Sequence, residues 1–289
     1  GIITVLLSVV LLNLQFKNKI TLIANAKINI GLNITEKRPD GYHNLETIFY
    51  PIELCDTLEF IQKEETKFGC SGLEIEGESD NNLIMKAYRL LKEEFDLPAI
   101  DIHLHKAIPM GAGLGGGSSD AAFMLKMLNN HFNLALSAQE LEQRATKLGA
   151  DCAFFIENKP ILAKGIGNIF EPTCINLNGY HIVLVKPEVH VSTAEAYGGC
   201  KPQRWTTPLE EAIKRPIAEW KDCIFNDFEK TVFVAHPELA EIKNMLYEKG
   251  AIYAAMSGSG STIYGIFDKE IEQNITTNIK SDVYYLTLK

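Results

Sequence analysis

The segment Pro-Met-Gly-Ala-Gly-Leu-Gly-Gly-Gly-Ser-Ser, residues 109–119, is the densest run of glycine in this 289-residue chain. Five of the 21 glycines lie between Gly111 and Gly117. The run follows an alternating strand pattern at 100–104 and precedes a helical pattern rich in Ala, Leu and Met at 118–132. Glycine allows positive φ and close approach of the backbone to a ligand, while a helix N-terminus offers free N–H groups and a positive dipole end. This arrangement predicts a cradle for the phosphates of a nucleotide.

Three other interpretations of the glycine run fit less well. A Walker A loop requires lysine where Gly117 stands. The dinucleotide pattern G-x-G-x-x-G is matched by Gly111, Gly113 and Gly116, but this weak pattern normally ends the first strand of a parallel βαβ unit, and here it follows Pro109. A flexible linker does not explain five glycines flanked directly by a strand and a strong helix.

A fourth pattern, Pro-x-x-x-Gly-Leu-Gly-x-x-x-Ser-Ser, fits the run from Pro109 to Ser119. Two more segments occur in order, Ala-Asn-Ala-Lys-Ile-Asn-Ile-Gly-Leu at 24–32 and Met-Ser-Gly-Ser-Gly-Ser at 256–261. Together the segments resemble the GHMP kinase family of small-molecule kinases over essentially all of the chain from residue 20.

The sequence patterns predict strands at 20–34, 47–52, 57–62, 100–104, 182–185, 251–256, 261–267 and 283–288, a turn at 38–41 and a hairpin or surface loop at 67–79. They predict helices at 83–95 after a capping region at 80–82, at 118–132, at 138–148 after a capping box of Ser137 and Glu140, and at 237–249. The irregular interleaving of these strands and helices favours an α+β fold. The resemblance implies a two-domain architecture, with an N-terminal nucleotide-binding α+β domain, a C-terminal ferredoxin-like α+β domain and the active site in the cleft between them.

We divide the chain into an apolar N-terminal extension (1–19), an ATP-binding domain with the phosphate loop (20–170) and a substrate-side domain (171–289). The second boundary follows the Gly-, Pro- and Asn-rich stretch 164–179. The apolar run 2–16 is shorter than the roughly 20 residues that a membrane-spanning helix needs, and it lacks the basic start and cleavage site of a signal peptide. A buried strand and a segment that is not native to the protein are the alternatives, and we favour the second.

Composition and charge limit the partners of the chain. It has 28 Lys+Arg and 37 Asp+Glu, a formal net charge of −9. Such a chain is a poor match for nucleic acid, because a phosphate backbone requires a broad basic surface. The six cysteines show no C-x-x-C or zinc spacing, which favours free thiols in a reducing compartment. We therefore expect a cytoplasmic protein without a nucleic-acid or membrane partner, present as a monomer or weak homodimer.

Two charged residues are candidates for the chemistry of phosphoryl transfer. Lys27 is the only charged residue between Ile20 and Thr35, in an apolar strand pattern where a lysine is costly unless it is paired. Asp151 follows a helix end at Gly149 and stands among apolar residues. Without the resemblance, Lys27 could be a snorkelling edge-strand residue and Asp151 a turn or cap residue. The resemblance implies that Asp151 is the base or hydroxyl-orienting residue and that Lys27 is its partner.

The resemblance also implies an acceptor that carries cytosine. The segment Arg-Pro-Asp-Gly-Tyr-His-Asn-Leu-Glu-Thr at 38–47 and the triple-glycine form of the loop are typical of family members that phosphorylate the 2-hydroxyl of a cytidine diphosphate derivative of a methylerythritol, in the non-mevalonate isoprenoid pathway. Tyr42 would stack on the base, His43 would hydrogen-bond to its edge, and Tyr197 would be the second aromatic wall. Relatives often have Pro and Phe where this chain has Ala194 and Tyr197. The implied substrate-binding set is Asn29, Tyr42, His43, Thr193, Tyr197, Gly258 and Ser259.

The cofactor implied by the resemblance is ATP with Mg²⁺. Lys106 precedes the loop and would meet ATP phosphate, whereas helix capping would explain Asn82 equally well. Mg²⁺ would be held mainly by phosphates and water, and the sequence shows no carboxylate cage that would form a metal site of its own. The implied ATP-binding set is Asn82, Lys106, Pro109, Met110, Gly111, Ala112, Gly113, Leu114, Gly115, Gly116, Gly117, Ser118 and Ser119.

Two other functions are left open by the sequence. Another GHMP small-alcohol kinase, of the homoserine or mevalonate type, would not need aromatic residues such as Tyr42 and Tyr197 around a base. A non-catalytic member that only binds nucleotide would not need both Lys27 and Asp151. The presence of all four residues therefore favours the kinase with the cytidyl substrate.

Overall fold

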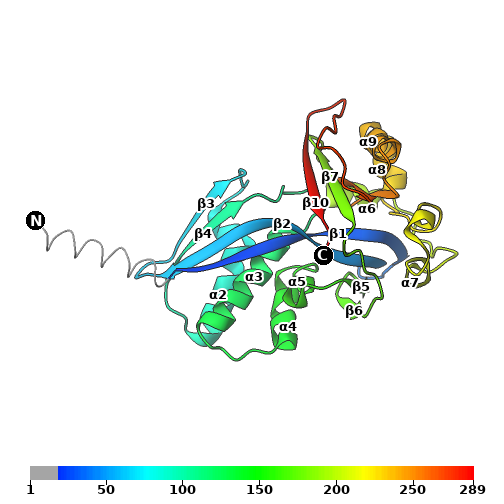
Figure 1. Ribbon diagram of the computed structural model, residues 1–289. Helices are drawn as coiled ribbons and strands as arrows, with labels where there is room; N and C mark the ends of the chain where they lie inside the picture. The colour runs from blue at the N-terminus through cyan, green and yellow to red at the C-terminus, as the bar shows by residue number, and fades with distance from the viewer. Residues whose placement is uncertain (1–18) are drawn as a thin grey trace, which may run out of the picture.

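The structure, a computed structural model, describes residues 19–289 (Figure 1), so the apolar extension lies outside the described residues except for its last one. Two long antiparallel strands, β1 (Ile20–Lys37) and β2 (His43–Gln62), run through the N-terminal half. The chain reverses between them at the predicted turn, where Gly41 N donates to Arg38 O at 3.1 Å. The β-branched, alternating sequence of β1 pairs with β2 from Ile20 to Lys37, interrupted by three register shifts.

β2 differs from the sequence prediction of two strands at 47–52 and 57–62. Cys55 pairs with Asn25, and Ile52 pairs with Ala26, so two residues of β2 stand opposite no residue of β1. A bulge of this kind bends and twists a strand without ending it. The irregular alternation around the bulge made one strand resemble two.

The other edge of β2 pairs with two shorter strands. The sheet has the order β3–β4–β2–β5–β6, with β1 beside β2. We predicted a hairpin or surface loop at 67–79, but β3 runs parallel to β4, and its glycine- and serine-containing sequence lacks the alternation that marks a strand. The bounds are β3 (Lys67–Gly72), β4 (Ile100–Lys106), β5 (Ile161–Lys164) and β6 (Ile169–Glu171).

Helices cover one face of this sheet (Figure 1). Asn82 caps α2 by accepting from Ile84 N at 2.9 Å, and Ser137 forms the predicted capping box of α4 with Glu140. The helices predicted at 83–95 and 138–148 therefore begin where their caps stand. The bounds are η1 (Ser79–Asn81), α2 (Leu83–Phe95), α3 (Gly116–His131), α4 (Ala138–Leu148) and α5 (Phe154–Glu157).

The C-terminal half has an antiparallel sheet of its own, in the order β10–β7–β9–β8. In chain order this is 4-1-3-2, the strand order of a ferredoxin-like sheet. The crossover 268–280 is irregular where a complete unit would carry a second helix. The bounds are β7 (His181–Pro187), α6 (Thr193–Gly198), α7 (Leu209–Ala212), η2 (Ile217–Asp222), α8 (Glu229–Ala235), α9 (Pro237–Glu248), β8 (Tyr253–Met256), β9 (Ile263–Phe267) and β10 (Ser281–Thr287).

One hydrophobic cluster joins the two sheets. Ala26 and Ile30 of β1 are buried in it together with Leu184 of β7 and Tyr264 of β9. The predicted boundary at 170/171 falls within β6, at the edge of the first sheet, and its separation of two domains stays a prediction. Among residues 19–289, no helix has the length and hydropathy that a membrane span requires.

Candidate active site

The glycine run forms a loop that leads from β4 into α3. Gly113 and Gly115 have φ of +78° and +69°, a left-handed conformation that L side chains rarely adopt. Gly115 caps α3, and Ser119 N donates to Gly115 O at 2.9 Å. The N–H groups of the first helical turn before Ser119 have no helical acceptor and lie at the positive end of the helix dipole. The loop therefore has the local geometry of an anion cradle.

The second glycine-containing loop, 257–262, packs directly on the phosphate loop. Ser257 Oγ donates to Gly113 O at 2.8 Å, and Thr262 N donates to Ala112 O at 3.2 Å. A Cβ on Gly113 would lie 2.0 Å from Ser257 O, so only glycine fits there. Two segments far apart in the sequence therefore form one wall of the site.

Lys27 projects from β1 against the phosphate loop, and its side chain is only 4% exposed. Its ammonium group donates to Asn29 Oδ1 at 2.5 Å and to Gly113 O at 3.1 Å. It also lies 3.6 Å from Asp151 Oδ2. Burial lowers the pKa of Lys27, and the nearby Asp151 carboxylate opposes that shift. The alternative of a snorkelling edge-strand lysine is wrong, because Lys27 is buried and paired.

Asp151 lies in the turn that follows α4. Gly149 ends the helix, and the turn brings the Asp151 carboxylate to Lys27. The Asp151 side chain is 37% exposed, so the carboxylate has an open side that Lys27 lacks. A carboxylate fixed at one side and open at the other can orient or deprotonate a substrate hydroxyl. The structure thus brings the two predicted catalytic residues together beside the loop.

Asn29 orients the Lys27 ammonium group from within β1 and is itself 4% exposed. Its Nδ2 donates to Thr47 Oγ1 at 3.0 Å, and Thr47 Oγ1 donates to Gly31 O at 2.6 Å. A Cβ on Gly258 would lie 3.3 Å from Asn29 Oδ1, so the second loop covers this amide. Thr47 was not predicted from the sequence, where its only signal is its place at the end of the 38–47 segment. Substrate contact by Asn29, Gly258 and Ser259 stays a prediction.

The residues predicted to bind the base, Tyr42, His43 and Tyr197, are not arranged as two tyrosine walls with a histidine at the edge. His43 and Tyr197 lie face to face, with ring centroids 4.8 Å apart and planes inclined by 26°. Tyr42, the expected stacking residue, is 62% exposed and has no ring partner among residues 19–289. Burial, with the charge of Asp151, raises the pKa of Tyr197 to about 12, so its phenol stays neutral. The aromatic pair is therefore His43 with Tyr197, and Tyr42 lies outside it.

The segment between β7 and α6 reaches the same region. Thr193, the first residue of α6, is exposed, and Ser192 caps the helix by accepting from Glu195 N at 3.0 Å. His190, which the sequence analysis did not single out, has its ring carbon Cε1 3.5 Å from the position of a Cβ on Gly111. Its only sequence signal is its place three residues before Thr193. The role of Thr193 in binding a diphosphate stays a prediction.

Lys106 does not face the open side of the phosphate loop, which corrects the prediction that it meets ATP phosphate. Its side chain is 2% exposed and lies 2.6 Å from Asp56 Oδ2 and 3.0 Å from Asp120 Oδ2. Asp56 Oδ1 accepts from Ala107 N at 2.7 Å and from Ile108 N at 2.8 Å. Burial raises the pKa of Asp120, the Asp56 carboxylate adds to this shift, and the Lys106 ammonium group opposes it. Lys106 of β4, Asp56 of β2 and Asp120 of α3 therefore join these three elements to the loop.

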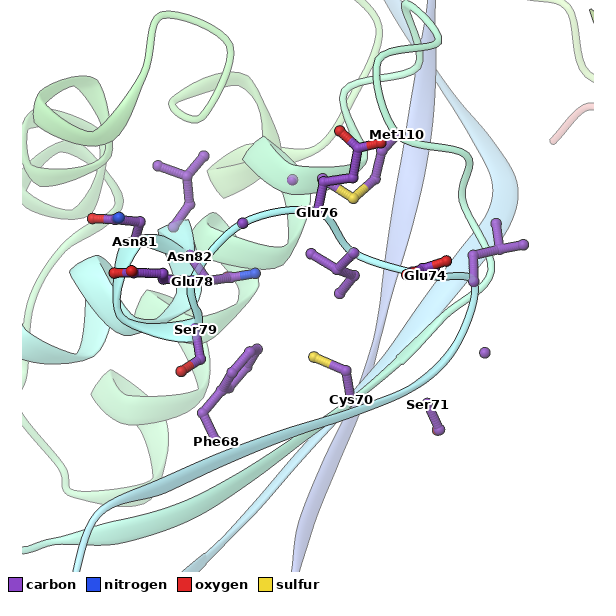
Figure 2. A pocket seen from close by; sticks show the side chains of 16 residues that line it. Phe68, Cys70, Ser71, Glu74, Glu76, Glu78, Ser79, Asn81, Asn82 and Met110 are labelled. Carbon is purple, nitrogen blue, oxygen red and sulfur yellow. The ribbon is translucent and has the colours of Figure 1, made fainter. Parts of the chain in front are cut away.

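A pocket of about 640 Å³ opens beside the loop, between β3 and the start of α2 (Figure 2). The predicted residues Asn82, Met110 and Gly117 line it. Asn82 thus lines the pocket and caps α2 at the same time. The β3 side of this pocket was not predicted from the sequence, because residues 67–79 were expected to form a hairpin or surface loop. Those residues are Phe68, Cys70, Ser71, Gly72, Leu73, Glu74, Ile75, Glu76, Gly77, Glu78 and Ser79.

Two buried oxygens at the start of α3 have no hydrogen-bond partner among the described residues, Ser119 Oγ and Asp120 Oδ1. A buried hydroxyl without a partner is costly, and a ligand in the cradle would remove that cost. In the part of the chain that the structure describes, no three His, Cys, Asp or Glu side chains form a metal cluster. Mg²⁺ commonly uses one or two protein ligands with phosphates and water. The site therefore fits a Mg²⁺ ion that arrives with a nucleotide.

Family models match both halves of the chain. The model of the GHMP kinases N terminal domain matches residues 82–159, and that of the GHMP kinases C terminal matches residues 209–285. The chain is 61% identical over 250 residues to 4-diphosphocytidyl-2-C-methyl-D-erythritol kinase of Bacteroides fragilis, covering 85% of this chain and 91% of that relative. It is 58% identical to the protein of the same name from Bacteroides thetaiotaomicron, with the same coverage.

Solved structures share the fold. A crystal structure of 4-(cytidine 5'-diphospho)-2C-methyl-D-erythritol kinase matches with a TM-score of 0.72 at 31% identity, covering 86% of this chain and 90% of that one. Homoserine kinase from Cytophaga hutchinsonii matches with a TM-score of 0.67 at 15% identity, covering 94% and 95% of the two chains. The second likeness concerns the fold alone. The α+β fold predicted from the sequence is confirmed.

Proposed function

The chain belongs to the GHMP kinase family, and we propose that it transfers the γ-phosphoryl group of ATP to the 2-hydroxyl of 4-diphosphocytidyl-2-C-methyl-D-erythritol. The observation that carries this proposal is the 61% identity to a kinase named for that substrate, along 85% of this chain. The Lys27–Asp151 pair beside the phosphate loop supports it chemically. The reaction would be a step of the non-mevalonate isoprenoid pathway.

Asp151 and Lys27 act on the acceptor hydroxyl in this proposal. The 2-hydroxyl oxygen bonds to the γ-phosphorus, the bond from that phosphorus to the β–γ bridging oxygen breaks, and ADP leaves. The hydroxyl proton passes to the open side of the Asp151 carboxylate, or Asp151 orients the hydroxyl. Lys27 supplies positive charge where negative charge develops. Asn29 and Gly113 O fix the ammonium group before substrate arrives.

ATP binding is assigned to the phosphate loop and the pocket beside it. The triphosphate would accept hydrogen bonds from the free N–H groups at the start of α3, and the base would enter the pocket of Figure 2, past Met110 and Gly117. When bound, Mg²⁺ neutralises charge on the β- and γ-phosphates. Ser119, whose buried hydroxyl has no partner among the described residues, is our candidate for its protein ligand.

The cytosine of the acceptor is assigned to Tyr197. The 4.8 Å between the rings of His43 and Tyr197 leaves no room for a base between them. The base would therefore replace the His43 ring on Tyr197, and the freed imidazole would hydrogen-bond to the base edge. Thr193, near the same face, would contact the diphosphate.

The remaining partners follow from charge and composition. We propose a cytoplasmic enzyme that binds only small molecules, as a monomer or weak homodimer. The net charge of −9 argues against a nucleic-acid surface. The free cysteines support a reducing compartment.

A coupled ADP-release assay tests the substrate. The purified chain is given ATP and Mg²⁺ with the cytidyl substrate, homoserine or mevalonate at equal concentrations. We expect kcat/KM for the cytidyl substrate to exceed the others by orders of magnitude, and phosphorus NMR of the product to show a new phosphate ester at the 2-position. A higher kcat/KM for homoserine or mevalonate would show that the chain is a small-alcohol kinase of the alternative type. ATP binding without turnover of any of the three would favour a non-catalytic member.

A further inference from the structure

A second pocket opens on the C-terminal half of the molecule. It has a volume of about 450 Å³ and lies between the segment 201–207 and the residues around η2 and the start of α8. It shares no lining residue with the pocket of Figure 2, and neither Lys27, Asp151, His43 nor Tyr197 lines it. Small-molecule sites commonly enclose roughly 300–1,000 Å³. The pocket is therefore of a size to hold a small organic ligand apart from the kinase site.

The charge of this pocket is opposite to that of the chain. Two acidic side chains, Asp222 and Asp227, line it together with four basic ones, whereas the chain carries −9. Arg204 is paired with Glu46 at 3.1 Å. The other three basic groups have no carboxylate within 4.0 Å in the described chain, and they are Lys201, Arg215 and Lys230.

One of the two acidic residues of the pocket already accepts hydrogen bonds on both of its carboxylate oxygens. Asp227 is 8% exposed, and its Oδ2 accepts from Asn33 Nδ2 and from Ile34 N, both at 2.8 Å. Its Oδ1 accepts from Trp205 Nε1 at 2.9 Å. The Asp227 carboxylate is thus occupied by these donors and forms no ion pair with a basic group of the pocket in the described chain, and the four basic side chains outnumber the two acidic ones.

The same contacts fix an aromatic corner in the pocket. Trp205 is held at its indole N–H by Asp227 and at its backbone N by Asn33 Oδ1 at 3.3 Å. Phe225 is 43% exposed, and its ring meets that of Trp205 at 86° with centroids 5.5 Å apart. Such a corner offers one ring face and one ring edge to a flat ligand. The ring of Trp205 is thus oriented before any ligand arrives.

We propose that this pocket binds a phosphate monoester that carries a flat ring, at a site separate from the kinase site. The phosphate would accept charge-assisted hydrogen bonds from Arg215, Lys201 and Lys230. The ring would stack in the corner of Trp205 and Phe225. Neither part alone explains the pocket, because an anion site needs no aromatic corner and an apolar site needs no free cations.

Tryptophan fluorescence tests this proposal, with phenyl phosphate as the ligand. The chain has two tryptophans, and Trp220 is 2% exposed, so a saturable change on titration reports on Trp205. Calorimetry on the same samples gives the dissociation constant. We expect binding to be at least about tenfold weaker in the double variant Lys201→Gln/Arg215→Gln, since two charge-assisted hydrogen bonds are lost. Inorganic phosphate, which lacks the ring, should bind more weakly than phenyl phosphate to the unaltered chain.

The matched control is Lys214→Gln/Lys221→Gln, which removes two nearby charges that do not line the pocket. It should bind phenyl phosphate as the unaltered chain does, and circular dichroism should show both variants folded. Kinase activity should be unchanged in both variants, because neither touches the active site. Equal binding by the two variants, no saturable fluorescence change, or equal affinity for inorganic phosphate would each overturn the proposal.

Discussion

The chemistry of the site depends on a contrast in burial between two neighbouring side chains. Lys27 is 4% exposed and has several fixed oxygen neighbours, whereas Asp151 is 37% exposed and has a free side. The lysine is thus held in place by the protein, and the carboxylate is left to meet the substrate. Sequence reasoning could name both residues, but it could not show which of the two faces the solvent.

Replacing Asp151 with asparagine keeps the size of the side chain and removes its charge and basicity. We expect Asp151→Asn to lower kcat by about 10²–10⁴-fold, the range typical of a lost general base, with little change in the dissociation constant for ATP. Steady-state kinetics and ATP titration measure the two effects. Asp101→Asn, a change on β4 away from the loop, is the control. Near-normal turnover by Asp151→Asn would remove this residue from the proposed role.

Lys27 should set the alkaline limit of the reaction. Burial lowers its pKa, partly opposed by Asp151, so its charged form is lost at a lower pH than that of an ordinary lysine. Because the charged form is the active one, kcat should fall as the pH rises through this lowered pKa. The variant Lys27→Arg should be less active for steric reasons. Its kcat should fall only at a higher pH than that of the unaltered chain, since a guanidinium keeps its proton. Identical limbs in the two proteins would show that another group titrates.

Two tyrosines that looked equivalent in the sequence differ in the structure. Tyr197 is packed against His43, while Tyr42 is 62% exposed. We expect Tyr197→Ala to weaken binding of the cytidyl substrate by about 1–3 kcal/mol, the usual worth of one base stack, and Tyr42→Ala to cost less. The KM for ATP should change in neither. A larger loss from Tyr42→Ala would show that substrate draws Tyr42 over the base.

At the scale of elements, local signals were sufficient where the structure depends on neighbouring residues. The α2 and α4 helices begin at caps, Asn82 and Ser137, that the sequence displays within one turn. β3 has no such signal, because a short strand at a parallel edge is specified by β4 rather than by its own alternation. The burial of Lys106 was not predictable for the same reason, because its partners Asp56 and Asp120 come from distant segments of the chain.

The joint between β4, the phosphate loop and α3 gives a prediction at this scale. Lys106→Met removes the only ammonium group between Asp56 and Asp120 and leaves two buried carboxylates facing each other. We expect the free energy of unfolding to fall by about 3–5 kcal/mol, as for other buried pairs that lose one partner. Urea denaturation measures the change, and the KM for ATP should rise as the loop loosens.

Two variants distinguish this joint from a general effect of substitution. Lys86→Met, on the exposed side of α2, should leave both stability and KM close to normal. Asp120→Asn should be milder than Lys106→Met, because burial already favours the uncharged form of Asp120. Unchanged stability of Lys106→Met would mean that the charge group does not hold the loop.

For the whole molecule, the family resemblance and the composition of residues 164–179 predicted two domains, and the structure shows what joins the two halves. β1 contributes Ala26 and Ile30 to the cluster that also buries Leu184 and Tyr264 of the second sheet. The two glycine-containing loops are hydrogen-bonded to each other at Gly113 and Ser257. The first half therefore carries residues whose burial depends on the second half, and no pattern within either half could reveal this.

Separate expression of the two halves tests this dependence. Fragment 19–170 would expose the apolar side chains of β1 that the second sheet covers, and burying such a side chain is worth about 1.5–3 kcal/mol. Since domains of this size are marginally stable, we expect the fragment to aggregate or to unfold without cooperativity.

In the intact chain both tryptophans lie in the second half, while helices α2–α5 in the first half contribute to the far-ultraviolet dichroism. The two signals should therefore give one coincident thermal transition. A fragment that unfolds cooperatively, or two separate transitions in the intact chain, would establish independent domains at the 170/171 boundary.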